Sequence, residues 1–172
     1  GYLLDSEQLA DRISQLDGKK HRTVAYIPEY AYSGAAIIAM GCDDIYMHPD
    51  AKIGDAAPIE VRPGEPFERA PEKVLSPLRE TLKLLGERKG RPPALLEAMA
   101  DKDLRVYEVT HSQTGRKSYA SEAEIEASGG EWIKGPLVAE SREDNLLTVT
   151  GRRAHDLQLA NDPVHDMGEL KQ

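Results

Sequence analysis

The sequence contains one cysteine, Cys42, so no disulfide can form within the chain. This excludes the small, disulfide-stapled class of domain. It is compatible with a reducing compartment and equally with an exported domain that needs no disulfide. Cysteine usage therefore leaves the compartment open.

Long apolar runs are also missing. The longest uninterrupted run is Ala35 to Met40, whereas a helix that spans a membrane needs roughly 18 residues. The chain begins GYLLDSEQ, with neither an initiator methionine nor a signal peptide. We therefore expect this sequence to be part of a longer protein.

Positive charge and metal-binding motifs are scarce. The formal net charge is −8 and the pI is about 5.2, which argues against nucleic acid as a partner and against a basic helix on a membrane surface. No HExxH, CxxC or glycine-rich phosphate loop occurs, and the pairs His155-Asp156 and His165-Asp166 are weak signals alone. We expect neither a metal nor a cofactor.

The residues that are present predict one domain. Apolar residues make up 40% of the 172 positions, enough for one sizeable core. Periodicity and turn residues predict a helix over 5–17 with a capping box at Asp5 and Gln8, and then a strand over 24–27 and a loop over 29–32. A helix over 33–42, a strand over 43–47 and a short extended piece within 52–58 follow. After a mobile loop over 59–72, we expect helices over 73–89 and 93–99. Alternating strands and helices indicate an α/β fold with parallel crossover units.

The pattern changes after about residue 104. We expect a β-hairpin from 104 to 119 around the turn SQTG, a short helix with a capping box at Ser121 and Glu124, a strand over 146–150, and a last helix over 151–160 capped by Thr150. The polar tail from Asn161 is expected to fray.

Ser33 stands at the beginning of the most apolar helix, after a strand and a loop. Backbone N–H groups at a helix start can bind an oxyanion, and Gly34 would let a substrate carbonyl approach. The plainer interpretation is that Ser33 is an ordinary helix cap. Position alone favours the cap.

A nucleophilic serine needs a base. Nothing singles out His48, His111 or His155. A lysine can serve if its amine is neutral, which requires a pKa near 7–8 instead of about 10.4. Lys73 is the candidate because it begins an amphipathic helix, beside an apolar face and the positive helix end. The alternative is that Lys73 is one of 22 basic residues on a wet surface.

Several segments resemble, in order, those of the NfeD-type, ClpP-class membrane serine proteases. AYSGAAIIAMGCDDIYMHPDAKIGDAAPI resembles the nucleophile segment, KVLSPLRETLKLLGERKGRP the lysine segment, and ALLEAMADKDL and TGRRAHDLQLA the later helices. The resemblance covers about residues 1–104 and 146–160, and 105–145 is interpreted as an insertion within a protease domain of residues 1–160. The tail then spans 161–172.

The resemblance implies a ClpP/crotonase-like fold of repeated strand–helix units whose N-terminal strands precede this chain. It also implies a Ser–Lys dyad, with Ser33 as nucleophile and Lys73 as general base. The backbone N–H groups of Gly34 and Gly1 would form the oxyanion hole.

The resemblance further implies substrates and surroundings. The enzyme would be a serine endopeptidase that cleaves apolar segments of stomatin-like membrane proteins. It would act as a homodimer or higher homo-oligomer, on the extracytoplasmic side of a membrane. Membrane segments would lie outside this chain.

Three departures from the family pattern leave alternatives open. Ser33-Gly34-Ala35 replaces the common Ser-Ala-Gly and is similar to signal peptide peptidase A, and Tyr30 and Tyr32 stand where small residues are usual. The histidine of the ClpP triad would fall near Ala56, where there is none.

Two other functions are therefore retained. The domain could be a scaffold of membrane microdomains without activity. It could also be a crotonase-type acyl-CoA enzyme using Glu29, Asp43 or Asp44, although such carboxylates are expected on solvated turns.

Overall fold

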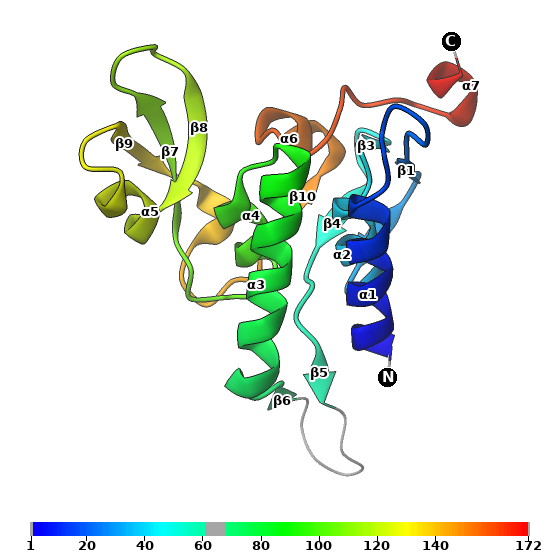
Figure 1. Ribbon diagram of the computed structural model, residues 1–172, viewed down its shortest axis with the longest axis horizontal. Coiled ribbons are helices and arrows are strands. Elements are labelled where there is room, and N and C mark those ends of the chain that lie inside the picture. Colours follow the sequence, from blue (N-terminus) through cyan, green and yellow to red (C-terminus); the bar gives the residue numbers. More distant parts are fainter. Residues whose placement is uncertain (1, 61–67, 172) are drawn as a thin grey trace.

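The computed structural model describes residues 2–60 and 68–171 and has a mixed α/β fold (Figure 1). Its first half contains α1 (Tyr2–Ser14), β1 (Val24–Ile27), β2 (Tyr30–Tyr32), α2 (Gly34–Met40), β3 (Asp44–Met47), β4 (Lys52–Gly54) and β5 (Ile59–Glu60). Its second half contains β6 (Glu68–Arg69), α3 (Glu72–Lys89), α4 (Pro93–Ala98), β7 (Val106–His111), β8 (Lys117–Ser121), α5 (Glu122–Ala127), β9 (Trp132–Leu137), η1 (Ala139–Ser141), β10 (Thr148–Thr150), α6 (Gly151–Asp156) and α7 (Met167–Leu170).

Two parallel strand pairs confirm the expected crossover units. β1 pairs with β3 in parallel, and β2 pairs with β4 in parallel. β10 completes the second sheet by pairing antiparallel with β4. Parallel strands need a crossover connection, and α2 lies in both connections: between β1 and β3, and between β2 and β4.

The helices cover these strands and close one core. Figure 1 shows α1 and α3 side by side, in blue and green, in front of the strands. The leucines of α3 that recur at helical spacing face inward, as expected of an amphipathic helix: Leu75, Leu78, Leu82 and Leu85 are all buried. Each such side chain contributes about 1.5–3 kcal/mol by leaving water.

The N-terminal helix differs from the prediction. α1 begins at Tyr2 and ends at Ser14, so Asp5 lies inside the helix and the expected capping box does not form at its start. The helix packs on α2, and Leu3 of its first turn packs against the core, which extends the helix past the local cap signal. Tertiary contact here outweighs a weak local preference.

β2 was expected to be loop. Tyr30–Tyr32 instead pairs with β4 in the register Tyr30↔Lys52, Ala31↔Ile53 and Tyr32↔Gly54. A strand of three residues gives no periodic signal, so only the partner strand reveals this element.

The segment after residue 104 forms a separate three-stranded sheet at one end of the molecule (Figure 1). Its order is β8-β7-β9, all antiparallel. The expected hairpin and the capping box of Ser121 and Glu124 are both confirmed. The third strand, β9, was missed because Gly135 and Pro136 interrupt its pattern.

The C-terminal part also differs in detail. Thr150 caps α6 as expected, through a bond from the Arg153 N–H to its hydroxyl, but the helix ends at Asp156. The tail does not simply fray: the Asn161 side chain accepts from the Ile45 N–H (2.9 Å), and the Val164 N–H donates to Met47 (2.9 Å).

Residues 59–72 were expected to be a mobile loop. Ile59–Glu60 and Glu68–Arg69 pair as two short antiparallel strands, and Ala70 is buried. The middle of that segment, 61–67, lies outside the described residues.

Candidate functional site

Ser33 occupies the sharp turn between β2 and α2. Its backbone has φ 54° and ψ −126°, a conformation that is rare for any residue other than glycine. Strained conformations of this kind persist only where the surrounding structure holds them, and they concentrate at functional sites. The turn presents the Ser33 side chain to solvent, where it is exposed.

This conformation excludes the ordinary cap interpretation. A capping serine has extended backbone and accepts a bond from the second or third helical N–H. Ser33 has neither feature: its carbonyl accepts from the Ile37 N–H (3.3 Å), but its hydroxyl caps nothing. No described residue hydrogen-bonds that hydroxyl, which leaves it available for chemistry.

A row of backbone hydrogen bonds connects the Ser33 turn to three other segments of the chain. The Ser33 N–H donates to the carbonyl of Asp55 (2.9 Å), and the Asp55 N–H donates to the carbonyl of Leu147 (3.1 Å). The Leu147 N–H in turn donates to Ala98 at the end of α4 (2.9 Å). The position of Ser33 is therefore fixed by three separate parts of the fold.

The other end of α2 is anchored by a buried arginine. Arg91 is 6% exposed and donates to the carbonyls of Met40, Cys42, Asp43 and Leu159 at 2.9–3.2 Å. Burial lowers the pKa of Arg91 to about 10, so it keeps its charge at neutral pH. A cation at a helix C-terminus also complements the helix dipole.

Asp43 ties α2 to the end of α3. Its carboxylate accepts from Lys89 (2.8 Å) and from the Thr23 N–H and hydroxyl (both 2.8 Å). The bonds from Lys89 and Thr23 lower the pKa of Asp43 to about 2.

Asp44 is likewise engaged and only 7% exposed, bonding Arg22 and Asn161. Both carboxylates serve the structure. The expectation of a solvated turn is wrong for Asp44, which is buried on β3, whereas Asp43 lies in the partly exposed turn before that strand. Glu29 contributes its carbonyl to the Lys52 N–H (2.9 Å) at the start of β4.

Lys73 lies in the first turn of α3 and is exposed. Its helix start is linked to the Ser33 turn by a small apolar cluster of Ala57, Ala70 and Leu75, against which Val74 and Leu146 pack. Ala57 follows Asp55 by two positions, and Leu146 precedes Leu147. The cluster therefore joins the start of α3 to the row of bonds beneath Ser33.

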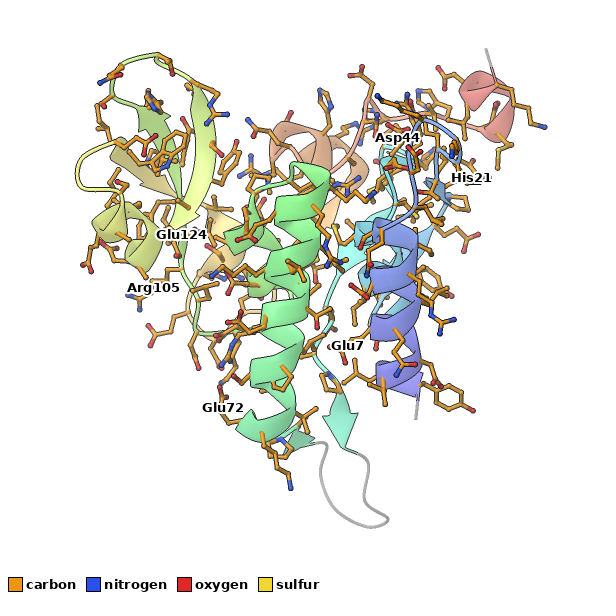
Figure 2. The ribbon with its side chains drawn as sticks, in the orientation of Figure 1. Glu7, His21, Asp44, Glu72, Arg105 and Glu124 are labelled. Atoms are coloured by element: carbon orange, nitrogen blue, oxygen red, sulfur yellow. The ribbon has the colours of Figure 1, made fainter. Side chains whose placement is uncertain are left out.

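No hydrogen bond joins the Lys73 amine to the Ser33 hydroxyl, although both side chains belong to the described residues. α2 and α3 are tied at their C-terminal ends, and α3 has 18 residues against 7 in α2. At 1.5 Å per residue, α3 is about 16 Å longer. The first turn of α3, where Glu72 is labelled, therefore lies at the end of the molecule away from the Asp43–Lys89 ion pair (Figure 2). Glu7 of α1 points between α1 and α3.

Gly34, the first expected oxyanion donor, follows Ser33 directly and begins α2. Gly1, the second, lies outside the described residues. The histidines are engaged elsewhere: the His48 Nδ1 accepts from the Asp50 N–H (3.2 Å), His111 contacts Glu131 (3.1 Å) and His155 contacts Asp162 (3.3 Å). His48 and Ser33 lie at opposite ends of the parallel pair of β2 and β4. His48 precedes the first residue of β4, whereas Ser33 follows the last residue of β2.

An apolar groove of about 480 Å³ runs along α1, β1, β2 and α2. Ala35, two positions after Ser33, lines it together with Tyr30 and Ile38. The Tyr30 ring is 65% exposed and stacks on that of Tyr32 with centroids 5.5 Å apart. An extended apolar segment can lie in this groove.

Sequence reasoning missed Asp55 and the pairing of β2. Asp55 has φ 45°, and the signal that could have found it is the Gly54-Asp55 pair directly after a strand, which is typical of a turn with positive φ. Within the described ranges, no group of histidine, cysteine and acidic residues could hold a metal ion. No helix there is both long and apolar enough to cross a membrane.

Comparisons with known proteins identify a family and a shared fold. The family model for the N-terminal domain of NfeD1b matches residues 4–131. Two solved structures of the 1510-N membrane-bound stomatin-specific protease are similar. A serine-to-alanine mutant has a TM-score of 0.64 at 19% identity, and a lysine-to-alanine mutant in complex with a substrate peptide has a TM-score of 0.60 at 20% identity.

The similarity covers 96% and 94% of this chain but only 59% and 54% of those two structures. At this identity it establishes the shared fold. No match was found among curated proteins.

Proposed function

Because the chain belongs to the NfeD1b N-terminal domain family, we propose that it is a serine endopeptidase domain with a Ser–Lys dyad. The observation that carries the proposal is Ser33 itself: a serine with φ 54° at a strand-to-helix turn, with an exposed hydroxyl that caps nothing. Nucleophilic serines of other hydrolases also sit on strained strand-to-helix turns.

Each residue has a role in the proposed reaction. Lys73 takes the proton of the Ser33 hydroxyl as the oxygen attacks the peptide carbonyl carbon, and the N–H groups of Gly34 and Gly1 stabilise the oxyanion. The C–N bond breaks, and the lysine proton goes to the leaving amine. Water then attacks the carbonyl carbon of the Ser33 ester and gives a proton to Lys73. The ester C–O bond breaks, Lys73 returns the proton to the Ser33 oxygen, and the carboxyl product leaves.

Two further points support the dyad. The serine and the lysine replaced in the two related structures are 41 positions apart in that protease, and Ser33 and Lys73 are 73 − 33 = 40 apart here. The apolar cluster also ties the start of α3 to the row of bonds under Ser33. The exposed amine must be covered on substrate binding or assembly, because only a desolvated lysine is a good base.

The proposed substrate is an apolar segment of a stomatin-like membrane protein. The related protease is described as membrane-bound and stomatin-specific. The apolar groove that begins next to Ser33 supports an apolar preference. We further propose that the domain works as a homo-oligomer on the extracytoplasmic side of a membrane.

The test is hydrolysis of a quenched fluorogenic peptide with an apolar centre by the full-length protein. Ser33→Ala and Lys73→Ala should each abolish measurable turnover. The matched controls are Ser76→Ala, an exposed serine in the second turn of α3, and Lys83→Ala, ten positions after Lys73 on the same helix. Both should cleave normally. Undiminished cleavage by either site variant would exclude the dyad.

The inactive scaffold is the second candidate function. One observation favours it: the Lys73 amine is exposed and is not bonded to Ser33. A scaffold would bind a stomatin-like protein without cleaving it. Binding that Ser33→Ala leaves unchanged, with no product from the unmodified protein, would establish the scaffold instead of the enzyme.

A further inference from the structure

We infer that Asp55 is a positioning residue of this site, which holds the Ser33 turn in its left-handed conformation through the backbone. The inference rests on the proposed function, because it assigns how the nucleophile is kept in place. Asp55 does not touch the reacting atoms in this role. Its contribution is the placement of its carbonyl oxygen.

The first observation is that two strained residues support each other. Among the described residues, four other than glycine have positive φ: Ser33, Asp55, Asp144 and Gln158. Ser33 and Asp55 are hydrogen-bonded directly, from the Ser33 N–H to the Asp55 carbonyl (2.9 Å). Each strained turn is therefore stabilised by the other.

The second observation is that the backbone around Asp55 cannot shift freely. Gly54 has φ 140°, and a side chain there would overlap the carbonyl of Leu147. The Asp55 N–H donates to that same residue (3.1 Å), and the Ala56 N–H donates to Met99 (2.8 Å). The direction of the Asp55 carbonyl is thus set by its φ of 45° and by bonds on both sides.

The third observation concerns the choice of aspartate. Its side chain is exposed and makes no hydrogen bond or ion pair with any described residue. Aspartate and asparagine adopt left-handed backbone far more readily than other residues with a side chain, and glycine does so freely. A β-branched residue in this conformation is a strong outlier. The requirement at position 55 is therefore conformational rather than electrostatic.

Peptide hydrolysis by the full-length protein tests the inference, with the quenched apolar peptide as the probe. Asp55→Asn and Asp55→Gly should keep kcat within about twofold, because both residues accept left-handed backbone. Asp55→Val should lower kcat by at least about tenfold, because a small displacement of a nucleophile is costly. KM should change by less than about twofold, since the loss is confined to the chemical step.

A matched control separates positioning from loss of stability. Gln158 also has positive φ, at 61°, but lies after α6 and takes no part in the row of bonds. Gln158→Val should lower the Tm as Asp55→Val does, yet leave kcat unchanged. Should Asp55→Val fail to fold, Asp55→Ala provides the same comparison with less strain.

Two results would overturn the inference. One is a normal kcat for folded Asp55→Val and Asp55→Ala. The other is an equal loss in Asp55→Asn, which would mean that the carboxylate charge matters. Failure of the proposed function is distinguishable, because either the unmodified protein would then give no product or Ser33→Ala would cleave as well as the unmodified protein.

Discussion

Gly34 packs against Ser6 of α1 so closely that a methyl group on Gly34 would overlap the Ser6 hydroxyl. That hydroxyl donates to the Tyr2 carbonyl (2.8 Å), which keeps it in place. The sequence suggested that glycine is needed here so that a substrate carbonyl can approach. The structure adds a second reason, which is contact between the start of α2 and α1.

Gly34→Ala should therefore destabilise the fold. Glycine to alanine normally favours a helix, but overpacking here should outweigh that gain and cost about 1–3 kcal/mol. The free energy of unfolding in urea measures the effect. In the double variant Ser6→Gly with Gly34→Ala, the cost should largely disappear, whereas simple addition of the two single effects would contradict the contact.

Arg91 should be essential for the anchoring of α2. Arg91→Ala leaves several buried carbonyl oxygens without donors, at about 1–3 kcal/mol each, so we expect a loss of at least about 3 kcal/mol in unfolding free energy. Arg91→Lys should recover little, because an ammonium cannot reproduce the planar fork. Arg152→Ala is the control: Arg152 pairs with Asp50 at the exposed surface, and its loss should cost about 0–1 kcal/mol. Equal losses in the two alanine variants would refute this anchoring role.

Glu97 should make stability depend on pH. Burial on α4, with the nearby Glu124 carboxylate next in effect, raises the pKa of Glu97 to about 7. Glu80, Lys83 and Arg79 of α3 also face it. Because the folded pKa exceeds the ordinary value of 4.5, its stabilising effect is complete below pH 4.5 and is lost as the pH rises through 7.

Glu97→Gln should thus be more stable than the unmodified protein above pH 7, by an amount on the order of 1 kcal/mol after solvent screening. The difference should shrink as the pH falls toward 4.5. Unfolding midpoints measured from pH 4 to pH 9 give the profile. Glu126→Gln, at an exposed position of α5, should show no such trend. A stability difference between Glu97→Gln and the unmodified protein that stays constant from pH 4 to pH 9 would contradict the burial of the Glu97 carboxyl group.

Much of the fold could be predicted because its signals are local. The leucine period of α3, the capping box at Ser121 and Glu124 and the hairpin of β7 and β8 all depend on neighbours within a few residues. β2 and β9 could not be found in this way. Their pairing depends on partner strands far along the chain, and Pro28 or Pro136 obscures the pattern.

The sequence suggested members of the candidate site but not their arrangement. Residue types and order singled out Ser33, Gly34 and Lys73 from the sequence. The strained φ of Ser33, the hydroxyl left without a capping role and the support from Asp55 appear only in three dimensions. The Ser33–Lys73 pairing stays a prediction.

The sequence by itself determined the helix periods, the acidic surface and the placement of one serine before an apolar helix, because these depend on adjacent residues. Only the tertiary structure decided the backbone conformation of that serine. A residue adopts φ 54° when hydrogen bonds from distant segments offset the strain, and those segments, around Asp55 and Leu147, meet only after the chain has folded.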